Sequence, residues 1–264
     1  MMNNDVRRQR QFQPRDRDAP AAVCLGAVAP ASMTYARLAE ALSPTVRVIT
    51  KDLECFAEAP PDTYTLESEM DGLIRTTEAA GIDRFHLLGY SVGGSLALVF
   101  ALAHPDRITS LTLIEPAWIG NAIESETEAK FLSDLDHVME VPPPARGPAL
   151  FAAVEPPFDG AGPVASLSPP AWLSDRAARF EFIWSALRNT SLNLAALRNF
   201  KRPLYLPVGG RSHPRFMLAA RQLATLCPTA VIGSYPGSSH LDPPHVAETD
   251  RFVANLCLMW RCAS

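Results

Sequence analysis

Short apolar runs alternate along this 264-residue chain with segments whose apolar residues recur at helical spacing. Such runs, bounded by polar or turn residues, are typical of buried strands, and their alternation with helices favours a parallel sheet with crossover helices. Strands are expected at Ala21–Leu25, Val46–Thr50, Phe85–Leu88, Ile108–Ile114, Pro203–Val208 and Ala230–Tyr235. The pattern therefore predicts an α/β fold.

Two helices are predicted between the early strands, at Thr34–Leu42 and Thr65–Ala80. The second one places its apolar residues on a single face, at Leu66, Met70, Leu73 and Ile74. A helix with one apolar face buries that face against a sheet. We therefore expect helices on both faces of the sheet.

The alternation stops between Trp118 and Phe200. Nine of the 24 prolines lie in residues 142–170, and the interval is rich in aromatic residues. A linker of this length without its own structure is unusual, and linkers are rarely so aromatic. The sequence predicts a helical cap with a proline-rich loop at residues 118–199, inserted into a core formed by residues 21–117 and 200–264.

The first twenty residues carry eight charges and no apolar segment, so we expect a disordered tail at residues 1–20 and neither a signal peptide nor an anchor. The longest uncharged stretch, Phe85–Pro105, is interrupted by polar residues and glycines, which favours a strand and a helix over a membrane span. The net charge of −4 argues against nucleic acid as a partner.

The five cysteines contain no C-x-x-C pair, and no metal-ligand spacing is present. We expect reduced thiols, a cytoplasmic protein and no metal or organic cofactor. The sequence leaves the oligomeric state open.

A candidate nucleophile follows the third predicted strand in the segment Gly89-Tyr90-Ser91-Val92-Gly93, and a helix of small and apolar residues comes next. This G-x-S-x-G pattern is typical of a sharp strand-to-helix turn that exposes the serine, and the glycines allow the close backbone approach that the turn requires. Ser91 is therefore the predicted nucleophile; the alternative is a merely structural turn.

From residue 21 to residue 260 the sequence resembles the α/β-hydrolases. Besides the serine segment, the resemblance rests on ASMTYARLAEAL after the first strand, GIDRFHLLGYSVGG before and around Ser91, and PGSSHLDPPH after the last strand. The resemblance implies eight mostly parallel strands, with the cap inserted after strand six. It also implies a serine, a histidine and an acid that act together.

A serine hydroxyl needs a neighbouring base. His240 follows the last strand and precedes a terminal helix, which is the position the resemblance implies for the base. His245 is the rival, although it more naturally begins the terminal helix.

Most members of the family that the sequence resembles carry the acid after the strand that corresponds to Pro203–Val208. The segment GGRSHP found there contains no acid. We therefore assign the acid to Glu115, at the end of Ile108–Ile114, where zearalenone-degrading lactonases and certain haloalkane dehalogenases of this family carry theirs. Asp242 and Asp250 are less suitable: one is two residues from His240, and the other is expected in the terminal helix. Glu115 could also merely cap the first turn of the cap.

For the oxyanion hole the resemblance implies the backbone N–H groups of Val92 and Ala27, with Gly26 and Val28 as alternatives to Ala27. The usual His-Gly of that loop is Leu25-Gly26 here, a change that leaves backbone donors in place.

These residues favour a serine hydrolase that cleaves a carboxylic ester or lactone of a small hydrophobic molecule through an acyl-enzyme. The substrate would be enclosed by aromatic residues of the cap, for which Trp118, Trp172 and Trp184 are candidates; core packing is the alternative role for each. Three other functions remain open on the same fold: cleavage of a C–C bond by a hydrolase or lyase reaction, thioester hydrolysis, and ligand binding with little turnover.

Overall fold

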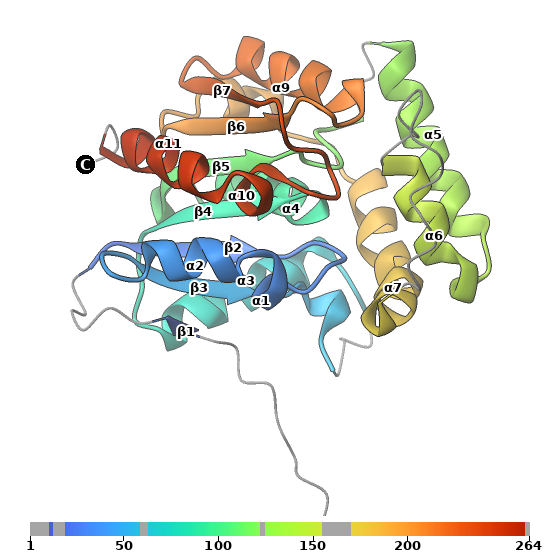
Figure 1. Cartoon of the computed structure of the whole chain (residues 1–264), viewed down its shortest axis with the longest axis horizontal. Coiled ribbons are helices and arrows are strands. Elements are labelled where there is room, and N and C mark those ends of the chain that lie inside the picture. Colours follow the sequence, from blue (N-terminus) through green and yellow to red (C-terminus); the bar gives the residue numbers. More distant parts are fainter. Residues whose placement is uncertain (1–10, 13–18, 59–62, 122–124, 155–169, 262–264) are drawn as a thin grey trace, which may run out of the picture.

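The computed structural model describes residues 11–12, 19–58, 63–121, 125–154 and 170–261. These residues contain one sheet, with strand order β1-β3-β2-β4-β5-β6-β7 (Figure 1). The strands are β1 (Gln11–Phe12), β2 (Ala21–Leu25), β3 (Arg47–Lys51), β4 (Phe85–Tyr90), β5 (Ile108–Ile114), β6 (Leu204–Gly209) and β7 (Ala230–Tyr235).

Strands β2 to β7 are parallel, and β1 pairs antiparallel with β3. The α/β class and the parallel sheet are thus confirmed, and each of the six strands predicted from apolar runs is present. The expected number of eight strands is wrong: the described residues form six parallel strands and the two-residue β1. The six apolar runs predicted as strands are β2 to β7, and the segment Gln11–Phe12 of β1, which pairs with β3, is not among them.

Helices lie on both sides of the sheet, with α2 and α11 in front of it and α3 and α4 behind it in the view of Figure 1. The helical elements are α1 (Ala31–Thr34), α2 (Ala36–Leu42), η1 (Glu54–Phe56), α3 (Leu66–Ala79), α4 (Val92–Ala103), η2 (Pro105–Arg107), α5 (Glu126–Glu140), α6 (Pro143–Val154), α7 (Ala171–Arg188), α8 (Leu194–Arg198), α9 (Pro214–Leu226), α10 (Pro244–Ala247) and α11 (Thr249–Arg261). No helix in the described part of the chain is long and apolar enough to cross a membrane.

The predicted helix at Thr34–Leu42 is divided into α1 and α2 at Tyr35. Tyr35 has a φ of −101° and a ψ of 6°, and its buried hydroxyl donates to the carbonyl of Leu25, 3.1 Å away. The tertiary contact thus takes precedence over helical continuity. In contrast, α3 begins as predicted, because Thr65 forms a capping box with Ser68.

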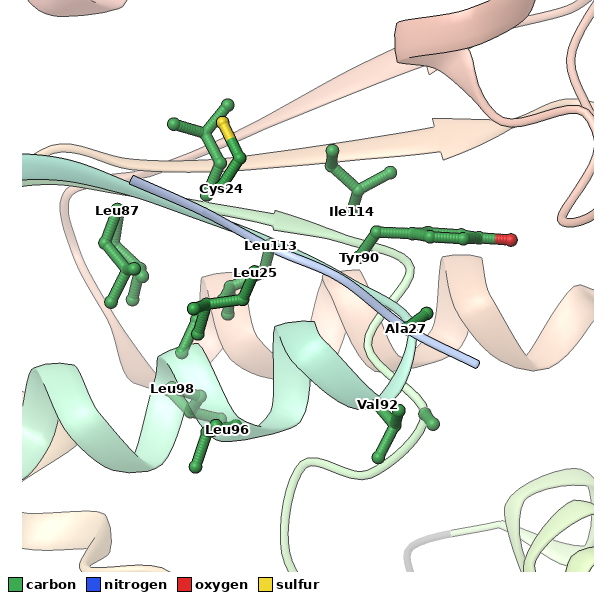
Figure 2. Close-up of a cluster of buried hydrophobic side chains, with 14 of the residues drawn as sticks. Cys24, Leu25, Ala27, Leu87, Tyr90, Val92, Leu96, Leu98, Leu113 and Ile114 are labelled. Atoms are coloured by element: carbon green, nitrogen blue, oxygen red, sulfur yellow. The ribbon is translucent and has the colours of Figure 1, made fainter. Parts of the chain in front are cut away.

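The core lies between the central strands and α4. Every residue of β4 is buried, and Leu96 and Leu98 of α4 lie beneath the leucines of the neighbouring strands (Figure 2). Burying one such leucine stabilises the fold by about 1.5–3 kcal/mol. The core holds β4 and α4 rigidly, and with them the turn that joins them.

Helices α5 to α8 lie between β5 and β6 in the chain, and we refer to them as the inserted helices. Of these, α5, α6 and α7 stand to one side of the sheet in Figure 1. The predicted proline-rich loop is partly helical, since α6 begins at Pro143 and contains Pro148. The remainder of that loop, residues 155–169, lies outside the described residues, as do residues 1–10 and 13–18 of the predicted tail.

Candidate active site

Ser91 occupies the sharp turn between β4 and α4. Its φ of 54° and ψ of −125° are unusual for a residue with a side chain. The turn is close-packed: a Cβ at Gly93 would collide with the carbonyl of Gly26, and a Cβ at Gly89 would collide with the carbonyl of Gly93. The two glycines of the motif are therefore required by space, and they allow Ser91 to lie at the N-terminus of α4.

His240 approaches Ser91 from the loop after β7. The distance from Nε2 of His240 to Oγ of Ser91 is 3.2 Å, within hydrogen-bond reach. The His240 side chain is 3 % exposed. A base in this position can accept the hydroxyl proton of Ser91.

Glu115 contacts the opposite nitrogen of the same imidazole. Its Oε2 lies 2.8 Å from Nδ1 of His240, and its Oε1 accepts the N–H of Gly209, the last residue of β6, at 2.7 Å. Glu115 is fully buried and has a φ of 46°. The carboxylate favours the tautomer of His240 that leaves Nε2 free to act as a base.

The structure brings Ser91, His240 and Glu115 together in the arrangement expected from the sequence. Asp242 is exposed, and Asp250 lies in the first turn of α11. His245, the rival base, is fully buried and stacked on Tyr35, with ring centroids 4.7 Å apart. Burial lowers the pKa of His245 to about 3, because a low-dielectric site disfavours the charged imidazolium.

Two aromatic residues that the sequence analysis did not select hold His240 in place. Phe216 of α9 stacks on the imidazole, with centroids 4.3 Å apart and planes inclined by 5°. The Tyr90 hydroxyl donates to the backbone carbonyl of His240. Tyr90 could have been suspected as the neighbour of Ser91, whereas Phe216 lies in an ordinary amphipathic helix and gives no local signal.

The loop between β2 and α1, residues 26–30, contains the predicted oxyanion donor; we refer to it as the oxyanion loop. The N–H of Gly26 donates to the carbonyl of Lys51 at 2.9 Å, so Gly26 is not available as a donor. Ala27 lines the cavity next to Ser91. Val92 begins α4, and the first N–H groups of a helix have no partner within it. The oxyanion role of Ala27 and Val92 stays a prediction, with Val28, which also lines the cavity, as the alternative to Ala27.

A cavity of about 340 Å³ opens onto Ser91 and His240. Its wall is mostly apolar and comes largely from the oxyanion loop, α1, the inserted helices, the loop after β7 and α10; it includes Met33, Leu135, Leu150, Phe151, Val154, Trp172, Phe180, Leu241 and Val246. No Lys, Arg, Asp or Glu lies in the wall formed by the described residues. The site can therefore accommodate an uncharged apolar group beside the serine.

The three candidate tryptophans have different surroundings. Trp172 lines the cavity. Trp118 and Trp184 are buried outside its wall, and their indole N–H groups donate to Asn121 at 2.8 Å and to Asp136 at 2.7 Å. These two residues pack the inserted helices, which was the alternative role considered for aromatic residues in this region. Among the residues that the structure describes, no group of three or more His, Cys, Asp or Glu could hold a metal ion.

Residues 29–138 match a family model described as alpha/beta hydrolase fold. Among curated proteins, monoacylglycerol lipase abhd6-B of Xenopus laevis is 41% identical over 76 residues, 28% of this chain and 21% of the relative. RutD of Cronobacter sakazakii, which is named for carbamate hydrolysis, is 28% identical over 130 residues, 47% of this chain and 41% of the relative. The matched part of this chain thus spans less than half the length of these relatives.

Solved structures match over nearly the whole chain. A carboxylesterase structure from Nitrososphaera gargenis has a TM-score of 0.71 at 19% identity and covers 93% of both chains. The 2-hydroxy-6-oxo-6-phenylhexa-2,4-dienoate hydrolase of Rhodococcus sp. strain RHA1 has a TM-score of 0.65 at 18% identity, covering 93% of this chain and 92% of its own. At such identities the likeness concerns the fold. Together with the strand order, it shows that the chain has the α/β-hydrolase fold, and residues 29–138 match the model of that family.

Proposed function

We propose that this protein is a serine hydrolase that cleaves a carboxylic ester or lactone of a small hydrophobic molecule through an acyl-enzyme. The observation that carries the proposal is the continuous contact from Ser91 Oγ to His240 Nε2, at 3.2 Å, and from His240 Nδ1 to Glu115, at 2.8 Å. A nucleophile, a base and an orienting acid in this order are the groups that acyl transfer requires.

In the first half of the reaction, Ser91 Oγ forms a bond to the carbonyl carbon while its proton passes to Nε2 of His240. The carbonyl oxygen becomes an oxyanion that accepts hydrogen bonds from the N–H groups of Ala27 and Val92. Collapse of this intermediate breaks the bond to the leaving oxygen, which takes the proton from His240. Glu115 remains ionised throughout and stabilises the imidazolium.

In the second half, water gives its proton to His240 and its oxygen attacks the acyl carbon. The second oxyanion occupies the same site, and the Ser91 oxygen leaves with the proton held by His240. The free acid departs and the enzyme is restored. In a lactone the leaving hydroxyl stays attached to the acyl group, so one molecule leaves instead of two.

The cavity supports an uncharged apolar acyl group as the substrate class. Its wall of aliphatic and aromatic side chains removes apolar surface from water at about 25 cal/mol per Å². The inserted helices contribute Leu135, Leu150 and Trp172 to this wall, which supports their role as a cap over Ser91.

C–C hydrolysis of the kind named for the Rhodococcus enzyme is a weaker alternative. A dienoate carries a carboxylate, and burying a carboxylate without a cationic partner is costly. No Arg or Lys is found in the described wall of the cavity. Thioesters share the apolar acyl group and remain a second substrate class for the same chemistry, while a binding protein would have no need of the base beside Ser91.

A fluorophosphonate probe followed by mass spectrometry of the labelled peptide tests the proposal. The probe should attach to Ser91, and Ser91→Ala should remove both labelling and hydrolysis of p-nitrophenyl octanoate. Labelling elsewhere, or an undiminished rate in Ser91→Ala, would contradict it. A parallel assay with an octanoyl thioester and a dienoate distinguishes the alternatives.

We also propose a cytoplasmic location. It is supported by the free thiols of the described residues Cys24, Cys55, Cys227 and Cys257. Fractionation of the source cells is the test.

A further inference from the structure

Arg176 of the inserted helix α7 reaches into the oxyanion loop. Its guanidinium donates to the backbone carbonyls of Val28 and Ala27, the latter at 3.2 Å. The Arg176 side chain is 9% exposed. Arg176 is therefore a direct link between the inserted helices and the loop that carries the predicted oxyanion donor.

The same guanidinium is paired with Asp52, at the end of β3. Its two terminal nitrogens lie 3.0 and 3.2 Å from the carboxylate oxygens, and Oδ1 of Asp52 also accepts the N–H of Ala31 at 2.8 Å. Asp52 thus holds the far end of the oxyanion loop, where α1 begins, while Arg176 holds its middle. The negative charge of Asp52 also compensates the positive charge of the buried Arg176 guanidinium.

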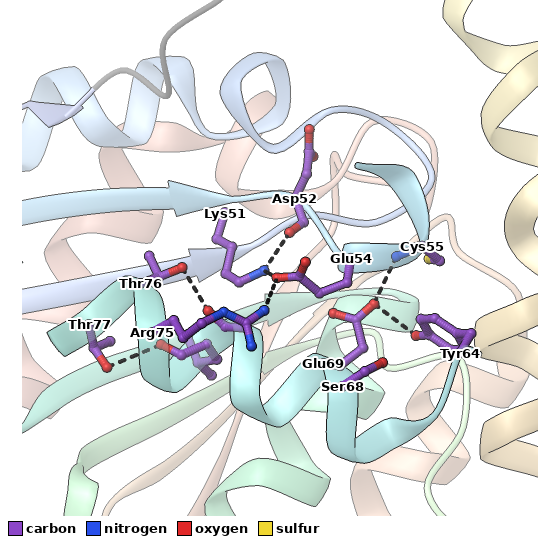
Figure 3. Close-up of polar contacts among 12 residues, drawn as sticks. Lys51, Asp52, Glu54, Cys55, Tyr64, Ser68, Glu69, Arg75, Thr76 and Thr77 are labelled. Carbon is purple, nitrogen blue, oxygen red and sulfur yellow. Dashed lines mark hydrogen bonds and ion pairs between the residues drawn. The ribbon is translucent and has the colours of Figure 1, made fainter. Parts of the chain in front are cut away.

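A rigid base supports Asp52. Figure 3 shows Asp52 at the end of β3, where the ammonium of Lys51 donates to the Asp52 carbonyl at 3.0 Å and to Glu54 at 2.8 Å. The guanidinium of Arg176 also lies 4.3 Å from the ring centroid of Phe56. The core side of these contacts is therefore held in place by its own hydrogen bonds. A movement of α7 would change the position of the Arg176 guanidinium relative to the oxyanion loop.

The residues four positions before and after Arg176 line the substrate cavity. Trp172 and Phe180 share a face of α7 with Arg176, because residues four apart in a helix are neighbours on its surface. One helix face thus contacts both the cavity and the oxyanion loop. An acyl chain long enough to touch Trp172 and Phe180 acts on the same element that holds Ala27 and Val28.

We propose that Arg176 is a positioning residue through which occupation of the cavity fixes the oxyanion loop. A long acyl chain packs on Trp172 and Phe180, holds α7 against the core, and keeps the two carbonyls in the Arg176 fork. The loop backbone is then fixed, and its N–H donor is aimed at the developing oxyanion. This inference rests on the proposed function, and it places part of the substrate preference in kcat, because remote binding contacts are used to orient the reacting groups.

The first experiment compares p-nitrophenyl acetate with p-nitrophenyl octanoate. The wild-type kcat should be higher for the octanoate, and Arg176→Met should remove most of this advantage, with a loss of about 10²-fold in kcat on the octanoate and little change in KM. Arg176→Lys should recover only part of the loss, because an ammonium cannot hold two carbonyls and a carboxylate in fork geometry.

Arg179→Met is the matched control. Arg179 lies on the same helix and donates to the carbonyl of Ala57 at 2.7 Å, so its loss removes a docking contact of α7 without touching the oxyanion loop. This control should keep the octanoate advantage. Equal losses on both esters in Arg176→Met, or the same loss in Arg179→Met, would overturn the inference and indicate general loosening of α7.

A second measurement is independent of turnover and of the stability of Arg176→Met. In Ser91→Ala, methyl nonyl ketone should slow hydrogen exchange of the backbone amides of residues 26–29 and 31, and acetone should not; adding Arg176→Lys should reduce this difference. If methyl nonyl ketone did not slow exchange of the oxyanion-loop amides, the proposed coupling between the cavity and the loop would be overturned. A wild type that binds the ketone in this way but hydrolyses no ester would instead contradict the proposed function alone.

Discussion

Glu115 Oε2 lies 2.8 Å from Nδ1 of His240, although the two residues are 125 positions apart in the chain. The contact joins the end of β5 to the loop after β7. The end of β6 contributes to the same contact, since the N–H of Gly209 binds the other carboxylate oxygen. An acid at the end of β5 is therefore placed for the role more often expected of an acid after β6.

Glu115→Gln should lower kcat by about 10³- to 10⁴-fold, because the amide preserves the shape of the contact but does not stabilise the imidazolium. Asp242→Asn is the matched control and should keep near-normal kcat, since Asp242 is exposed. Steady-state kinetics on p-nitrophenyl octanoate measure both. An active Glu115→Gln together with an inactive Asp242→Asn would transfer the role to the histidine loop.

Ser91→Ala and His240→Ala should each reduce kcat by several orders of magnitude, and the double variant should be scarcely slower than either single one. The reason is that a nucleophile without its base, and a base without its nucleophile, lose the same step. Rates of the three variants relative to wild type provide the measurement. Multiplicative losses would mean that the two side chains act independently.

Glu128→Gln should destabilise the fold by about 3–5 kcal/mol, since it leaves the buried guanidinium of Arg215 without its counter-charge. The pair is bidentate at 2.8 and 2.9 Å and joins α5 to α9. Lys130→Ala breaks an exposed pair on α5 and should cost less than about 1 kcal/mol. Urea unfolding of both variants tests this, and similar midpoints would contradict the buried-pair argument.

The free energy of unfolding should fall as the pH is lowered from about 6.5 towards 3. Burial lowers the pKa of His245 to about 3 and that of His86 to about 4, so in this range the unfolded chain binds protons that the folded chain does not.

His245→Phe should make this pH dependence shallower, by up to about 1.4 kcal/mol per pH unit. The ring nitrogens of His245 have no hydrogen-bond partner among the described residues, so phenylalanine removes no bond there. Urea midpoints at about pH 5 and 7.5 test the change in slope. An unchanged slope would show that His245 does not contribute.

The sequence predicted β2, β5 and β7 to the residue, because each is a short apolar run with clear boundaries. It also indicated Ser91, His240 and Glu115, since each of them follows a strand at the same edge of the sheet. Phe216 and Arg176 could not be predicted, because their contacts depend on how α9 and α7 pack, and local spacing carries no information about packing. Trp118 and Trp184 illustrate the same limit, since an aromatic residue favours a cavity wall and a packed core equally.

Ser91 and Glu115 are also the two non-glycine residues with positive φ within the described parts of the chain. A side chain in that region of backbone space costs roughly 1–2 kcal/mol that glycine does not pay. Ser91→Gly should therefore be more stable than Ser91→Ala while both are inactive. A glycine in this turn would thus make the fold more stable but would remove the nucleophile. The strained serine lowers the free energy of unfolding and provides the hydroxyl that the proposed reaction needs.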